Sequence, residues 1–482
     1  MERLVAWARG CGGEWHPHLE VKHGTLRGRG VFAVEPIARG ELLLKLPKAL
    51  AVHPSDELAA LVENNECNPF LALVLTALHE MHVSQDRSPY FAYFADSVPT
   101  DEHPLLWDAA AVGLLSGSLL PPNLTAVDVE AAMGAAFERD VMPVMERLGE
   151  VYLPCAARAL PTFVRTLALC LSHALHGRVA FELDSASLWP ALGVDAPDVA
   201  PPFLLPLFDR LNHSSNALER CTRLVTTGDT FEMRAERDVA AGEELLHSYG
   251  SQGSAELFRT YGFVEPCGSP HTTVMLRRSA LVDAAIATDA LSNSRHTHLS
   301  AGQQSMTRAD AARRMAALER HHRLPAAFSL SMASGVPAPL LTAVQVLLMA
   351  DEELEAWEEA GGIELGEAFL EEDTGVIACL LKLCAPRHPG AAAAVVGGCA
   401  PSSAASTVTL LRSEENAILK RVRAAVLMLA CGAESEDSEE SEEGEAEGGS
   451  GEEEEEDEDE EERGAAVGEE QGGRDFKRSR QR

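Results

Sequence analysis

Two polar side chains and a histidine follow an apolar run near the middle of the chain. Asp209, Asn212 and His213 lie within five residues, directly after Leu205–Phe208. An aspartate and a histidine can ligate a metal ion, but the sequence suggests no third ligand nearby, so we predict no metal site. The segment Asn212-His213-Ser214 can also be a turn or a cap, because such side chains bond to neighbouring backbone groups. The residues alone leave a ligand-binding and a structural interpretation open.

Two tyrosines precede glycines at matched positions further along the chain. Tyr249-Gly250 and Tyr261-Gly262 are twelve residues apart, and the chain holds only five tyrosines. Each of the two is either a site residue or a buried core residue. Earlier, the closely spaced glycines of Arg27-Gly28-Arg29-Gly30 would let the backbone approach a ligand without a Cβ in the way. On its own this last pattern indicates only a turn.

The elements that must position these residues show both strand and helix patterns. Strand patterns with turn residues beside them occur at Gly30–Val34, Glu41–Leu46, Phe231–Ala235 and Glu244–Tyr249. Residues 1–10 predict a short helix, and from about 56 to 176 apolar residues recur at helical spacing. We therefore predict an α+β fold in which a β-rich domain, residues 1–265, is split by a helical insertion at about 56–176.

The rest of the chain predicts a helical domain and a tail. Apolar stripes at helical spacing return from about residue 280, so we predict an all-helical domain over 280–431, with the stripes forming its core. Residues 434–482 hold 23 acidic and six basic residues, a net charge of −17 within the chain's −35. Such a segment cannot bury enough apolar surface to fold, so we predict a disordered acidic tail. Its basic end, Lys477–Arg482, is either a nuclear-import or docking patch or a solvated end.

Composition argues against several classes of protein. With 46% hydrophobic residues the body can form a large core, but the acidic balance gives no basic footprint, so we expect no direct nucleic-acid binding. The ten cysteines form no CxxC pair, which indicates reduced thiols in a cytosolic or nuclear protein. We find no signal peptide and no apolar run long enough for a bilayer, so we expect no membrane association. We expect the cytoplasm, then the nucleus, and leave a plastid open.

Taken in order, these segments resemble the SET-domain methyltransferases, and among them the class of the Rubisco large-subunit lysine methyltransferase. The resemblance runs from about residue 4 to 431 and rests on Ile37-Ala38-Arg39-Gly40-Glu41, Ser88–Phe94, Trp107, Asn212-His213-Ser214 and Tyr249. It implies a SET fold followed by a helical substrate-binding domain. No cysteine-rich module follows Tyr261, which fits this class and argues against the histone-type SET enzymes that carry one.

The resemblance also implies roles for individual residues and S-adenosylmethionine as the cofactor. Tyr249 matches the active-site tyrosine of the family. Arg178 matches an arginine that binds the cofactor carboxylate, which suits the forked guanidinium. The implied cofactor-binding residues are Arg27, Gly28, Arg29, Arg178, Asn212 and His213, and the implied substrate-binding residues are Asp209, Tyr261 and Phe263.

The sequence departs from the family pattern in three places. Glycine stands at 177 before Arg178, where the family has serine. Gly253-Ser254-Ala255-Glu256-Leu257 lacks the family's asparagine, and Arg210 replaces a residue that is usually apolar.

The leading functional prediction is a protein-lysine N-methyltransferase that acts as a monomer on a non-histone protein. One branch of the class methylates histidine instead, and that alternative stays open. The alternative from another class is a catalytically silent SET-like scaffold. It would bind basic proteins by charge, through the helical domain and the acidic tail. The presence of Arg178, Asn212, His213 and Tyr249 favours an active enzyme.

Overall fold

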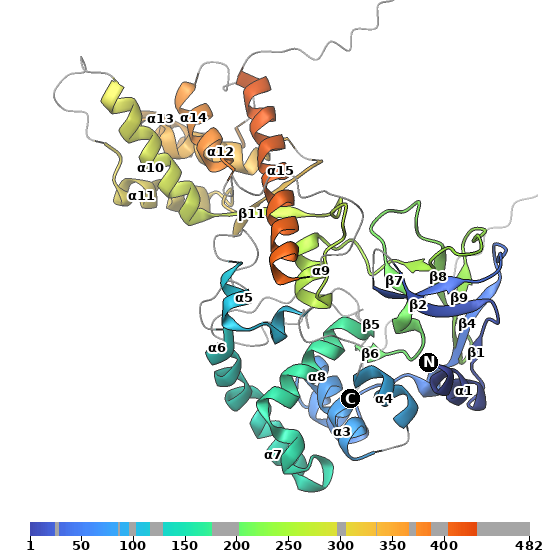
Figure 1. The fold of residues 1–482 in the computed structure, drawn as a ribbon. Helices are drawn as coiled ribbons and strands as arrows, with labels where there is room; N and C mark the ends of the chain where they lie inside the picture. The colour runs from blue at the N-terminus through green and yellow to red at the C-terminus, as the bar shows by residue number, and fades with distance from the viewer. Residues whose placement is uncertain are drawn as a thin grey trace, which may run out of the picture. The chain divides into compact units, whose positions relative to one another are not determined.

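The computed structural model describes residues 1–24, 28–84, 87–95, 103–115, 129–175, 202–295, 305–333, 335–365, 373–386 and 403–430 (Figure 1). It mixes helices and sheets, so the predicted α+β fold is confirmed. The predicted acidic tail, 434–482, lies outside the described residues, and the domain boundaries stay predictions. No helix in the described ranges is long and apolar enough to cross a membrane.

The β-rich part is built from two segments of the chain that are far apart in sequence. Its largest sheet is antiparallel with the strand order β1 (Glu14–Trp15), β4 (Leu42–Pro47), β9 (Thr230–Ala235) and β8 (Thr222–Thr227). β2 (Leu19–His23) pairs with β3 (Arg29–Ala33). Two further pairs join β5 (Ala174–Leu175) with β6 (Phe203–Leu204), and β7 (Asn212–His213) with β10 (Leu246–His247). Because β4 pairs with β9, residues on either side of the helical segment form one sheet.

Helices occupy most of the chain between these two β segments. They are α2 (Asp56–Glu63), α3 (Pro69–His82), α4 (Ser88–Ala95), α5 (Ala109–Gly113), α6 (Val129–Ala136), α7 (Met142–Tyr152) and α8 (Leu160–His173), and α1 (Glu2–Gly10) precedes them. The start of α3 shows why a helix begins there: Asn68 Oδ1 accepts a hydrogen bond from the backbone N–H of Phe70 (2.8 Å), and proline stands at the first position.

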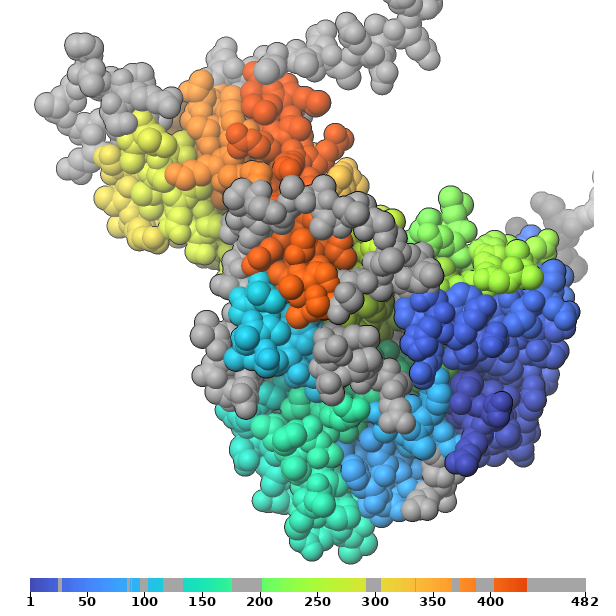
Figure 2. All heavy atoms as spheres, in the orientation of Figure 1, coloured from blue at the N-terminus to red at the C-terminus, as the bar shows by residue number. Residues whose placement is uncertain are grey.

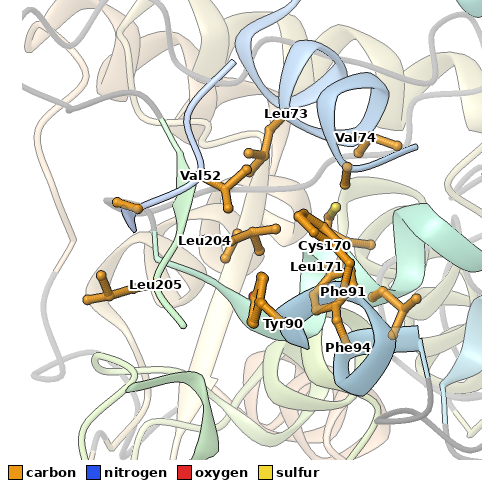
Figure 3. Packing of buried hydrophobic residues seen from close by; sticks show 14 of the residues in the cluster. Val52, Leu73, Val74, Tyr90, Phe91, Phe94, Cys170, Leu171, Leu204 and Leu205 are labelled. Carbon is orange, nitrogen blue, oxygen red and sulfur yellow. The ribbon is translucent and has the colours of Figure 1, made fainter. Parts of the chain in front are cut away.

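The helical segment and the β-rich part share one hydrophobic core. Figure 3 shows residues from α3, α4 and α8 in contact with Val52 and Leu204, which also form an isolated β-bridge. Tyr90, Phe94 and Leu204 are fully buried in this cluster. The core therefore fixes α4 against the segment that leads into the candidate site.

The C-terminal part has its own core and is mainly helical, as predicted. It contains α10 (Arg278–Arg295), α11 (Arg308–Arg320), α12 (Ala338–Leu348), α13 (Asp351–Glu359), α14 (Thr374–Leu383) and α15 (Ala404–Ala430). The all-helical prediction for 280–431 needs one correction, because β12 (Ala327–Ser331) lies inside that range and pairs with β11 (Thr273–Arg277), which precedes it. Val274 and Leu276 face the core while their neighbours are exposed, so the alternation is short and easily missed.

A small third cluster joins α15 to elements near the candidate site. Leu115, Val408 and Leu411 pack with Phe258 of α9 (Ser254–Tyr261) and with Val264. Arg412 also donates a hydrogen bond to the Leu114 carbonyl (2.5 Å), and Figure 2 shows the start of α15 beside α5. The last long helix thus reaches the loop that follows α9.

Candidate active site

The candidate site begins where the glycine-containing strand β3 meets a second partner. On one side β3 pairs with β2. On the other side, Leu245 N–H donates to the Val31 carbonyl (2.7 Å) and Ala33 N–H donates to the Glu243 carbonyl (2.9 Å). A Cβ at Gly30 would collide with Glu244 Oε1 and lie 2.8 Å from Asn212 Nδ2. Only glycine at position 30 leaves room for the Glu244 and Asn212 side chains to lie across strand β3.

Asn212 is oriented by two groups that can only accept hydrogen bonds. Its Nδ2 donates to the Arg29 carbonyl (3.2 Å) and to Glu244 Oε1 (2.7 Å). A backbone carbonyl and a carboxylate both require the NH₂ end of the amide, so the orientation of Asn212 is fixed. The Asn212 side chain thus joins its segment to the backbone of β3 and to the side chain of Glu244.

His213 and Tyr249 are brought together by the parallel pair β7 and β10, in which His213 lies opposite His247. The backbone N–H of Tyr249 donates to His213 Nδ1 (3.0 Å), and the two rings stack with centroids 5.0 Å apart. The Tyr249 hydroxyl donates to the Leu211 carbonyl (2.7 Å). Both ends of Tyr249 are therefore held by the segment 211–213.

Tyr249, Tyr261 and Phe263 form one aromatic cluster. The ring centroids of Tyr249 and Tyr261 are 4.7 Å apart, and Phe263 lies 6.1 Å from Tyr261 and 6.4 Å from Tyr249. Burial raises the pKa of Tyr261 to about 12. Burial also raises the pKa of Tyr249 well above its ordinary value, and Tyr261 and Asp209 raise it further. Both hydroxyls therefore stay protonated at neutral pH, in surroundings that disfavour charge.

A buried ion pair lies beside this cluster. Arg210 binds both oxygens of Asp209 through Nε (2.8 Å) and Nη2 (2.5 Å), and Tyr90 of α4 donates its hydroxyl to Asp209 Oδ2 (2.9 Å). The Arg210 guanidinium also lies 4.9 Å from the centre of the Tyr93 ring. Burial alone lowers the pKa of Arg210, but the contact with Asp209 outweighs it and holds that pKa above its ordinary value.

The same segment carries backbone strain. Leu207 is fully buried and has φ of +75° and ψ of −41°, a sparsely populated conformation that costs about 1–3 kcal/mol. It directly precedes the turn Phe208–Arg210 and the residues that hold Tyr249. Strain of this kind persists only where surrounding contacts fix the backbone, here the core around Leu207 and the Asp209 ion pair.

Most of the predicted site residues lie in the described part of the chain. The structure brings together Arg29, Asn212, His213, Tyr249, Tyr261 and Phe263 through the contacts above. Gly28 has φ of +68°, and a Cβ at this position would meet no atom within 4 Å. Arg27 and Arg178 lie outside the described residues. The Asp209 side chain is fully buried in its ion pair with Arg210, so it stabilises the segment that carries Asn212 and His213.

Several residues at the site were not predicted from the sequence. Glu244, Tyr90, Tyr93 and Ser215 each contact a predicted residue or its neighbour. Ser215 directly follows the Asn212-His213-Ser214 signature, which is a local signal that could have suggested it. The contacts of Tyr90 and Tyr93 join positions more than a hundred residues apart, and local patterns do not encode such distances.

Comparison with known proteins shows which family this part of the chain resembles. Residues 28–250, a little under half of the chain, match the model of the SET domain family. The expected resemblance to SET-domain methyltransferases of the Rubisco large-subunit class is confirmed.

Named relatives and solved structures agree with this similarity. The N-lysine methyltransferase SETD6 of Mus musculus is 27% identical over 273 residues, which are 55% of this chain and 54% of that protein. Ribosomal lysine N-methyltransferase 4 of Saccharomyces cerevisiae is 25% identical over 287 residues, 56% of each protein. The structure of Rubisco LSMT bound to AdoMet shares the fold, with a TM-score of 0.55 and 16% identity over 89% of this chain and 92% of that one. The chain spans about half the length of the curated relatives it matches.

Proposed function

We propose that this protein is an S-adenosylmethionine-dependent protein-lysine N-methyltransferase. The observation that carries the proposal is the fixing of Tyr249 within the aromatic cluster: its hydroxyl is held by the Leu211 carbonyl and its backbone N–H by His213 Nδ1. The residues that hold Tyr249 adjoin Asn212, which is bonded to the glycine-containing strand. A candidate catalytic hydroxyl and a candidate cofactor-binding segment are thus one rigid unit.

The residues present suit a cationic cofactor. A Cβ at position 30 would fill the place where Glu244 and Asn212 meet, so glycine keeps this region open to polar groups. The Glu244 carboxylate there complements a positive charge. Arg29, Asn212 and His213, with Gly28, Arg27 and Arg178, are the residues we propose to hold S-adenosylmethionine. When bound, the cofactor supplies a methyl group activated by its positively charged sulfur.

The residues of the chain would prepare the lysine amine for attack. A free lysine has a pKa near ~10.4, so it must lose a proton before it can act as a nucleophile. The surroundings that raise the pKa of Tyr261 disfavour charge, and the same burial would lower the pKa of an amine placed there. Alignment of the amine rather than a covalent intermediate would supply most of the rate.

The direction of one hydrogen bond defines what Tyr249 can offer to that amine. Its single hydroxyl proton is already donated to the Leu211 carbonyl. The oxygen therefore presents lone pairs, and it can accept an N–H of the amine while the nitrogen lone pair points elsewhere. Tyr249 would orient the nucleophile without itself ionising.

We further propose a non-histone protein as the substrate and the cytoplasm as the site of action. The names of the relatives support a protein substrate, since they include an N-lysine methyltransferase and a ribosomal lysine N-methyltransferase.

Transfer of a labelled methyl group tests the proposed function. The purified protein is incubated with S-adenosylmethionine carrying a radiolabelled methyl group and with a whole-cell lysate. Two variants run in parallel, Tyr249→Phe and Tyr152→Phe. Tyr152 is the matched control, because its hydroxyl also makes a hydrogen bond, to Ser55 Oγ (2.8 Å), but lies outside the candidate site. We expect a labelled protein band with wild type and with Tyr152→Phe, and a loss of at least about a hundredfold with Tyr249→Phe.

Two results would count against the proposal. Equal labelling by wild type and Tyr249→Phe would show that the Tyr249 hydroxyl takes no part in the reaction. If no band is labelled, calorimetry with S-adenosylmethionine decides between two explanations. Binding would mean that the lysate lacked the substrate, and no binding would favour the non-catalytic scaffold.

A further inference from the structure

A chain of buried hydrogen bonds leads away from His213 on the side opposite Tyr249. His213 Nε2 lies 3.0 Å from Ser215 Oγ, and the Ser215 hydroxyl donates to Ser269 Oγ (3.2 Å). The Ser269 hydroxyl in turn donates to the carbonyl of Gln252 (2.6 Å). His213, Ser215 and Ser269 are each at least 93% buried, so water does not compete for these bonds.

The two ends of the chain fix the direction of every proton in it. The Gln252 carbonyl can only accept, so Ser269 must donate to it and must accept from Ser215. Ser215 then has no proton left for His213 and must accept from Nε2–H. At the other end, the backbone N–H of Tyr249 can only donate, so Nδ1 must be the unprotonated nitrogen. The serine end requires a proton on Nε2 and the Tyr249 end requires an unprotonated Nδ1, so together they select the neutral Nε2–H tautomer of His213.

Two carboxylates hold the backbone of the two serines. Glu265 Oε1 accepts from the N–H of Ser215 (3.0 Å), and Glu414 Oε1 of α15 accepts from the N–H of Ser269 (2.8 Å). Glycine precedes Ser269, with φ of +72°, and a Cβ there would collide with the Glu414 carboxylate. The position of Ser269 is therefore set by a residue of the C-terminal helix.

We propose that Ser215 and Ser269 are positioning residues that hold His213 in its neutral Nε2–H tautomer, and that Glu414 seats Ser269 for this task. The consequence for the reaction, which rests on the proposed function, is that Nδ1 stays available to hold the backbone of Tyr249. Glu414 links the C-terminal helical part to the residue that we propose to be catalytic. Neither serine would touch the substrate.

The tautomer itself can be measured without any activity. Histidine is labelled with ¹⁵N, and the His213 ring signals are assigned as those lost in a His213→Asn variant. In wild type we expect one unprotonated Nδ1 and one protonated Nε2. Ser269→Ala removes the acceptor of the Ser215 proton, which can then point at His213 Nε2 and compete with the Tyr249 N–H, so we expect a mixture of tautomers. Ser269→Thr keeps the hydroxyl and should restore the wild-type spectrum. If Ser269→Ala does not fold, Ser215→Ala breaks the same chain one step earlier.

Steady-state kinetics then tests the consequence. We expect kcat to fall about five- to tenfold in Ser269→Ala, the size of one lost hydrogen bond, with the KM for the protein substrate little changed and with rescue in Ser269→Thr. An unchanged His213 tautomer in both alanine variants would overturn the proposal even if the protein is an active methyltransferase. A shifted tautomer in a protein that transfers no methyl group would leave the positioning of His213 intact and refute the proposed function instead.

Discussion

Gly30 offers a sharp test of how the candidate cofactor site is built. In Gly30→Ala the new Cβ would collide with Glu244 Oε1 and come within 2.8 Å of Asn212 Nδ2. Glu244 is flexible and can swing away, but it then gives up its 2.7 Å bond to Asn212. A hydrogen bond to a charged group contributes about 1.5–3 kcal/mol, and this bond fixes the orientation of the Asn212 amide.

The expected loss appears in the affinity for S-adenosylmethionine. Since 1.4 kcal/mol corresponds to a factor of ten, the variant should bind the cofactor about ten- to a hundredfold more weakly, measured by titration calorimetry. Gly40→Ala is the control. Gly40 has φ of +87°, and a Cβ added to it would meet no atom within 4 Å. Alanine at this position therefore costs about 1 kcal/mol of stability through backbone strain alone. Its cofactor affinity should not change.

A Gly30→Ala variant that folds as wild type does and binds the cofactor equally tightly would contradict this role of Gly30. An equal loss of cofactor affinity in Gly40→Ala would also contradict it, because the loss would then follow the general stability of the fold. Addition of Glu244→Asp to the Gly30→Ala variant should recover part of the affinity, since the shorter side chain withdraws the carboxylate from the new Cβ.

Three further predictions concern stability. Arg210→Met leaves Asp209 buried without its cation and should cost about 3–5 kcal/mol in urea denaturation, whereas Asp209→Asn with Arg210→Met should cost clearly less than the two single changes together. His103 is fully buried, and burial is the main reason that its pKa is lowered to about 4. Its neutral form therefore stabilises the fold above pH 6.5. As the pH falls from 6.5 to 4, the protein should lose roughly 3 kcal/mol of its free energy of unfolding. His103→Gln should flatten that part of the stability profile, and a profile equally steep in the variant would exclude His103 as its cause. Gly268→Ala should lower the melting temperature by several degrees, because the new Cβ collides with Glu414 and displaces α15 from the loop that holds Ser269. An unchanged melting temperature would show that the Glu414 carboxylate is not held beside Gly268.

The sequence predicts the local elements well because their signals are local. The glycine-containing strand appears as β3, over Arg29–Ala33, and the first helix as α1. The predicted strand Glu244–Tyr249 is shorter, with β10 limited to Leu246–His247. The reason is that the segment changes its pairing partner: Glu243–Leu245 pairs with β3, whereas Leu246 and His247 pair with β7.

Helix ends were predicted less well than helix existence. Within the apolar stripes predicted from about residue 280, the residues from Leu340 to Trp357 fit a single helix face, but the structure divides them into α12 and α13 at Met349 and Ala350. Asp351-Glu352-Glu353 marks the new start, and Glu353 Oε2 accepts from the Ala350 N–H (2.8 Å). Three acidic residues in a row are an N-terminal signal that the apolar periodicity hides.

The candidate site could be predicted only in part. Residues within a motif, such as Asn212 and His213, are found by their order in the chain. Ser269 and Glu414 are not, because they lie 56 and 201 positions beyond His213 and reach it only through the fold. Arg210 was visible as a departure from the family, but its ion pair with Asp209 and its contact with Tyr93 required coordinates.

The identity of the methylated residue tests the central claim most directly. The band labelled by the wild-type protein is excised, digested and analysed by mass spectrometry, with the Tyr249→Phe reaction as the blank. Our account predicts a methyl group on the side-chain nitrogen of a lysine, present with wild type and absent with the variant. A methyl group on histidine, or a methylated lysine that persists with Tyr249→Phe, would contradict it.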